Sequence, residues 1–101
     1  MSDARVFLYR LDGHAAVPEP DTLRWARWFE TADRTVARTE IAPAILVSTV
    51  FLGIDDGHLG LFETMVFGGS LEDFFSERYP TWDAAERGHD CVVLALRRAI
   101  R

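Results

Sequence analysis

Lysine is missing from this sequence of 101 residues, and cysteine occurs once. The lone Cys91 excludes an internal disulfide and fits a reducing compartment. Its apolar neighbours predict a buried thiol. The longest uncharged stretch, 41–54, contains Pro43 and Gly53 and is too short for a membrane span. The sequence therefore predicts one soluble, cytoplasmic domain over residues 1–101.

All basic side chains are Arg, and the formal net charge is -5. Residues 39–90 carry most of the acids, whereas residues 91–101 carry Arg and no acid. An acidic segment argues against direct nucleic-acid binding, which depends on clustered basic side chains. It permits an acidic face that meets a partner protein with a basic surface, and the competing interpretation is simple solubility. The exclusive use of Arg reflects coding bias or selection for bidentate contacts with anions.

Hydrophobic patterning predicts an α+β fold: a four-stranded, mostly antiparallel sheet with the element order βαβββα and both helices packed on one face. A linker is expected at 17–20, and one or two helical turns are allowed within 70–79. The strand at 34–41 is expected near an edge because of its charges. The expected strands cover 5–11, 34–41, 44–54 and 58–67, and the expected helices begin at 21 or 22 and after Thr81.

The segment Asp55-Asp56-Gly57 predicts a three-residue hairpin loop between two of these strands. If Ile54 and His58 close the loop, Thr49 faces Glu63. Both faces of the hairpin are largely apolar, and two helices cover only one of them. The open face therefore predicts a homodimer. Its candidate residues, in a register that could be reversed, are Leu46, Val50, Leu52, Phe62 and Val66.

Glu63 is the most informative single residue, because the predicted register places it among apolar side chains. A buried carboxylate is costly unless it is paired or protonated. Glu63 is then either a ligand-contacting or general-base carboxylate, with Thr49 opposite it, or a structural carboxylate paired with an Arg or a Trp N–H. The sequence leaves both interpretations open.

Neither a metal site nor a covalent nucleophile is predicted. The His and Asp residues lack the spacing of known metal motifs, and Ser48 lacks a nucleophile elbow or an evident oxyanion loop. His89 falls on the apolar stripe of the last helix and is expected to be a hydrogen-bonded core residue. No cofactor is expected. The side chains weighed for a metal site are His14, His58, His89, Asp12, Asp55 and Asp56.

Arginine and tryptophan lie close together in the first third of the chain. Such a cluster can grip a phosphate and stack a base. The competing interpretation places the Trp rings in the core and the Arg side chains on a solvated face. The cluster consists of Arg24, Arg27, Arg34, Arg38, Trp25 and Trp28. The candidate ligand-binding residues are Glu63, Thr49, Arg24, Arg27, Trp28 and His14.

Five segments of the chain are distinctive: 9–14, 25–30, 48–53, 61–67 and 78–82, the last accompanied by Gly88 and His89. Together they resemble small, uncharacterised proteins encoded by phages and prophages. The resemblance covers most of the chain and carries no catalytic residue. It implies a small accessory protein that acts on the host, including its defence systems, by binding.

These observations predict a non-enzymatic phage or prophage accessory protein that binds a host protein. A counter-defence, anti-CRISPR-like inhibitor is its most concrete form. A small-molecule binder that sequesters a nucleotide signal is the second hypothesis, and a metal-dependent hydrolase is the third.

Overall fold

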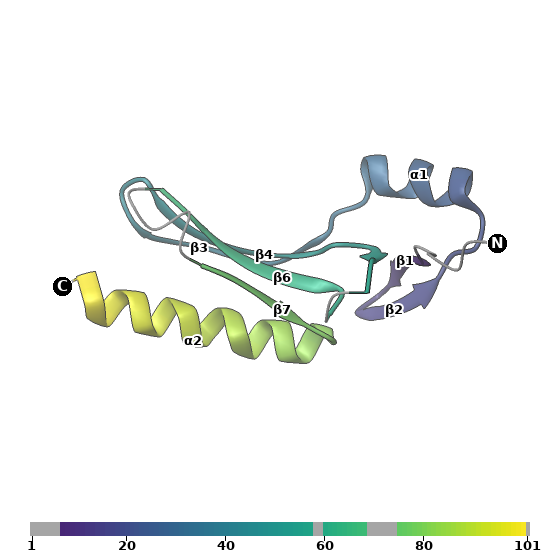
Figure 1. Cartoon of the computed structure of the whole chain (residues 1–101). Helices are drawn as coiled ribbons and strands as arrows, with labels where there is room; N and C mark the ends of the chain where they lie inside the picture. Colours follow the sequence, from purple (N-terminus) through teal and green to yellow (C-terminus); the bar gives the residue numbers. More distant parts are fainter. Residues whose placement is uncertain (1–6, 58–59, 69–74, 101) are drawn as a thin grey trace.

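The computed structural model describes residues 7–57, 60–68 and 75–100, and it confirms an α+β fold with a four-stranded antiparallel sheet. The described residues form two helices and two antiparallel sheets (Figure 1). The elements are β1 (Phe7–Asp12), β2 (Ala15–Pro18), α1 (Thr22–Thr31), β3 (Thr35–Ala42), β4 (Ile45–Phe51), β5 (Ile54–Asp55), β6 (Phe62–Phe67), β7 (Ser76–Tyr79) and α2 (Trp82–Ile100).

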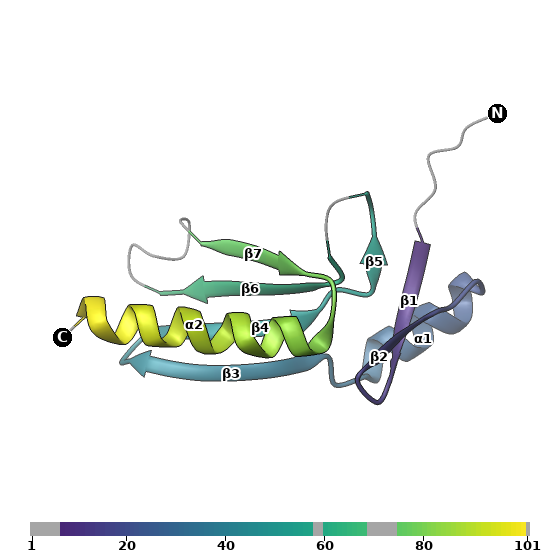
Figure 2. The same ribbon diagram turned by 90° about the horizontal axis from the view of Figure 1, so that it is seen from below.

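The larger sheet has the order β3-β4-β6-β7, and α2 lies along one of its faces (Figure 2). β3 is an edge strand, as its charges predicted. The fourth strand, β7, occupies part of the region in which helical turns were allowed. The remainder of that region, 70–74, lies outside the described residues.

The smaller sheet has the order β2-β1-β5, and α1 packs against β1 rather than beside α2. The first predicted strand therefore belongs to this second sheet. The predicted linker at 17–20 was wrong in part, because Val17 and Pro18 belong to β2 and pair with Arg10 and Tyr9 of β1. Pro18 is tolerated because β2 is an edge strand, where an N–H is dispensable.

The predicted hairpin register was wrong by one residue. Thr49 pairs with Thr64, and Glu63 pairs with Val50. The cause lies after β4, where Gly53 adopts a φ of 78° and the chain turns into β5 to pair with β1. The Asp55-Asp56-Gly57 segment therefore does not close a β4–β6 hairpin. A one-residue shift moves every side chain of one strand to the other face.

Both helices begin where the sequence predicted. The Asp21 carboxylate accepts from the backbone N–H groups of Leu23 and Arg24, and the Thr81 hydroxyl accepts from that of Ala84. Gly88 lies within α2, where glycine is normally unfavourable. A Cβ at this position would collide with the ring of Tyr79, so Gly88 permits the close approach of α2 and β7.

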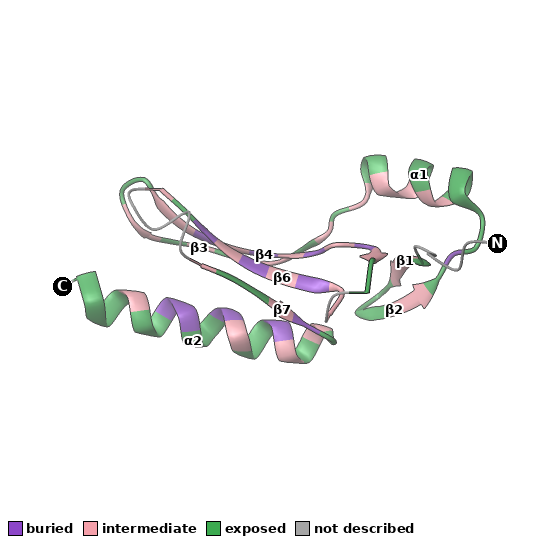
Figure 3. Cartoon of the chain, viewed as in Figure 1, coloured by how far each residue is buried: buried purple, intermediate pink, exposed green. Residues whose placement is uncertain are grey.

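The core lies between α2 and the larger sheet, and buried residues line the facing sides of both (Figure 3). It contains two apolar clusters: Val47, Val66, Val92 and Val93, and Phe51, Phe62, Tyr79 and Ala85. Phe62 and Val66 were predicted on the open face, but the register shift buries them here. Cys91 was predicted to be buried and is exposed.

We predict that Ala44→Gly stabilises the fold. Pro43 and Ala44 form the two-residue connection between β3 and β4, and Ala44 has a φ of 67°. Relief of this left-handed conformation, offset in part by the entropy of glycine in the unfolded chain, should add about 0.5–1 kcal/mol. Urea unfolding measures the change. Ala26→Gly, on the exposed side of α1, is the control and should lose stability. A loss in both variants would contradict the prediction.

Candidate functional site

A hydrogen-bonded row of polar side chains separates the two apolar clusters. His89 of α2 bonds through Nδ1 to the Thr49 hydroxyl and through Nε2 to the Thr39 hydroxyl, both at 2.8 Å. The Thr49 hydroxyl also lies 2.5 Å from that of Thr64. Thr49, Thr64 and His89 are buried. The predicted role of His89 as a hydrogen-bonded core residue is confirmed, and Thr49 contacts it rather than Glu63.

This row accommodates a neutral imidazole, and burial disfavours the charged form. A neutral His ring offers one donor and one acceptor, which suits a hydroxyl group on each side. Burial lowers the pKa of His89 below its ordinary value of 6.5, and the adjacent Asp90 opposes that shift. The lowered pKa makes protonation at mildly acidic pH a cost to the folded state.

We predict that the free energy of unfolding falls as pH is lowered through 6.5 toward the folded-state pKa of His89. In that window the unfolded His89 binds a proton and the folded one does not, so the slope reaches at most about 1.4 kcal/mol per pH unit. Urea unfolding between about pH 7.5 and about pH 5.5 measures it.

His89→Gln should cost roughly 1–3 kcal/mol at neutral pH, because it disturbs buried hydrogen bonds. It should also flatten the pH dependence. The exposed His14, changed to Gln, is the matched control and should preserve the slope. An unchanged slope in His89→Gln would refute the assignment.

Glu63 lies on the opposite face of the sheet and has structural partners. Its carboxylate accepts from the Ser76 hydroxyl at 2.7 Å and lies 3.6 Å from Nε of Arg78. Arg78 in turn lies 3.3 Å from Asp56. The Glu63 side chain is 17% exposed, so water also reaches it. These contacts agree with the ion-pair interpretation and leave a ligand role without direct support.

Glu63→Gln should therefore be nearly neutral for stability, within about 1 kcal/mol, because Gln still accepts from Ser76 and a partly exposed ion pair contributes little. Glu63→Leu should also be tolerated, since Arg78 retains Asp56. Thermal melts of both variants measure this. A loss of several kcal/mol in Glu63→Gln would show that the carboxylate charge is essential to the fold.

The carboxylate that sequence analysis missed is Glu19, which is 5% exposed. It accepts from Nε of Arg10 at 3.3 Å and from the backbone N–H of Asp21 at 3.1 Å. Glu19 thereby fixes the junction between the small sheet and the start of α1. Its position between two prolines gave no signal of burial, because the partner Arg10 comes from another strand.

The Arg–Trp cluster is dispersed. The indole N–H of Trp25 donates to the Tyr9 carbonyl, and Trp28 packs edge-on against Phe51. Arg34 stacks over Phe29 and donates to the Phe51 carbonyl. Of the remaining cluster members, Arg24 and Arg27 lie exposed on α1, and Arg38 lies exposed on β3.

His14 stacks on Trp82, with ring centroids 3.8 Å apart and planes 7° from parallel. This contact ties the β1–β2 turn to the start of α2. Ser48 and His89 lie on opposite sides of the larger sheet, so His89 is not placed to activate the Ser48 hydroxyl. His58, one of the side chains weighed for a metal site, lies outside the described residues.

Within the described ranges, no group of three or more His, Cys, Asp or Glu side chains is arranged to hold a metal ion. A search of the same ranges finds no helix with the length and apolar character needed to cross a membrane.

One face of the larger sheet is free of helices in the described chain, since α2 lies on the other face and α1 lies beside the small sheet (Figure 1). A hollow of about 560 Å³ opens at one end of this open face. Phe67, which is 43% exposed, lines it together with Leu46. Arg38 and Glu40 border the same hollow. By strand alternation the open face carries Leu46, Ser48, Val50, Glu63, Met65 and Phe67.

Comparison of the chain with protein-family models, curated proteins and solved structures finds no match.

Proposed function

We propose that this chain is a non-enzymatic binding protein whose target is another protein and whose binding surface is the open face. The observation that carries the proposal is the exposed Phe67 beside Leu46 in a broad hollow, on a sheet face that no described helix covers. An aromatic side chain in a hollow is a common anchor of protein interfaces.

The contacts of the candidate catalytic side chains, His89 and Glu63, favour a binding role over a catalytic one. His89 is engaged between two Thr hydroxyls, and Glu63 is engaged with Ser76 and Arg78. A catalytic base needs reach to a substrate proton, which a buried His surrounded by core side chains does not have. The net charge of -5 favours a partner with a basic surface through long-range attraction.

The resemblance to phage and prophage proteins supports a host protein as the target. A counter-defence inhibitor is the most concrete form of this proposal.

The test uses the immobilised protein in bacterial host lysate, followed by reconstitution with the purified captured protein. Phe67→Glu should weaken binding at least about tenfold, because it places a charge in the apolar centre of the interface. Leu23→Glu is the matched control, since Leu23 is an exposed apolar residue on α1. If Phe67→Glu leaves binding unchanged, the partner binds at a surface other than the open face. A co-purified nucleotide and no protein partner would favour the small-molecule hypothesis.

A further inference from the structure

The outer edge of β3 carries a self-complementary charge pattern. Arg38 and Glu40 are both exposed and, two residues apart, they project from the same face of the strand. In the described chain β4 is the sole strand paired with β3, so half of the β3 backbone groups point away from the sheet.

We propose that this edge pairs antiparallel with the same edge of a second copy, on a two-fold axis through Thr39. In that register Arg38 of each copy faces Glu40 of the other, so the contact contains two opposite-charge pairs. The two larger sheets then join into one continuous sheet. The inference does not rest on the proposed function, because it concerns the backbone edge of β3 and the charges along it. Arg38 and Glu40 also border the hollow of the open face, so the two surfaces adjoin.

The charges also select this register over others. Parallel in-register pairing would place like charges beside each other, and a shift by one residue would separate both pairs. The register shifts at Val36 and Ile41 limit the regular part of β3 to 37–40, which is the segment that contains both charges. Charges and bulges on an edge strand normally oppose pairing with foreign strands. In the proposed register, a second copy offers each of these charges an opposite charge.

The flank of α2 next to β3 carries a second charge pattern that is complementary to the same flank of a second copy. Thr39 bonds to His89, so the proposed axis passes near the middle of α2. Two copies of α2 would then run antiparallel on the same side of the joined sheet. The side of α2 next to Ala37 carries Asp83, Glu86 and Asp90 along a hollow of about 370 Å³, accompanied by Arg87.

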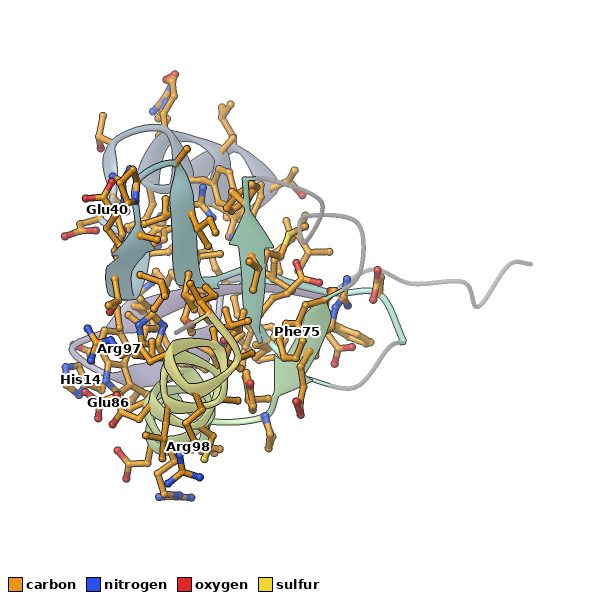
Figure 4. All side chains as sticks on the ribbon, turned by 90° about the vertical axis from the view of Figure 1, so that its left-hand side faces the viewer. His14, Glu40, Phe75, Glu86, Arg97 and Arg98 are labelled. Carbon is orange, nitrogen blue, oxygen red and sulfur yellow. The ribbon has the colours of Figure 1, made fainter. Side chains whose placement is uncertain are left out.

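Figure 4 shows Arg97 and Glu86 on the same flank of α2, and it shows Glu40 at the same edge of the molecule. Glu40 itself projects from the open face of the sheet. The acidic first half of one α2 would therefore face the Arg97 end of its copy. Opposite charges at the two ends of one helix attract each other when two copies pack antiparallel.

The experiment measures the oligomeric state by sedimentation and native mass spectrometry. The wild type should be a dimer at micromolar concentration. Arg38→Glu and Glu40→Arg should each weaken dimerisation at least about tenfold, because each converts both attractive pairs into repulsive ones. The double swap, Arg38→Glu with Glu40→Arg, should restore the dimer. Arg24→Glu, an equal charge change on exposed α1, should have no effect.

Mixing provides the sharpest test. Arg38→Glu carries Glu at both positions and Glu40→Arg carries Arg at both, so two separately monomeric variants should form a heterodimer when mixed. Circular dichroism verifies that each variant is folded. A monomeric wild type, a dimer insensitive to both single changes, or no heterodimer on mixing would overturn the inference. A dimer broken by Val50→Glu and not by Arg38→Glu would place the contact on the open face and would also overturn it.

Discussion

The contact of His89 with Thr39 and Thr49 is the interaction on which the rest of the structure depends. It joins α2 to β3 and β4, and the Thr49–Thr64 contact extends it to β6. Buried polar groups must be satisfied, and the directions of these bonds are narrow. Val47, Val66 and Val92 can repack in several ways, whereas this row admits one position of the helix over the sheet.

That alignment fixes which surfaces are available. With α2 held beneath the sheet, the alternate side chains of β4 and β6 form the open face, which holds Leu46 and Phe67. The same alignment places the middle of α2 beside Thr39 at the outer edge of β3. Open face and strand edge are thus adjoining surfaces set by one packing interaction, and they meet where Arg38 and Glu40 border the hollow. A protein that joins copies through the edge would present two open faces to a target.

The small sheet has a different role. Glu19 and Arg10 hold the β1–β2 hairpin near the start of α1, and the Trp25 N–H joins α1 to the carbonyl of Tyr9. The stack of His14 on Trp82 closes this unit against α2. Several residues that the sequence suggested for phosphate or metal binding instead form contacts that hold these elements together. Arg34 shows the same pattern, because it stacks on Phe29 and bonds to Phe51.

The sequence by itself determined the local features. The start of each helix follows from Asp21 and Thr81, because capping is a contact between near neighbours. The edge position of β3 and the hydrogen-bonded place of His89 follow from charge and helical period. Only the tertiary structure decided the register of β4 with β6, since it depends on Gly53 sending the chain to a distant strand. It also decided the partners of Glu63, the burial of Glu19 and the exposure of Cys91. Each of these depends on side chains that come together from separate elements. Local sequence patterns do not show which distant residues become neighbours.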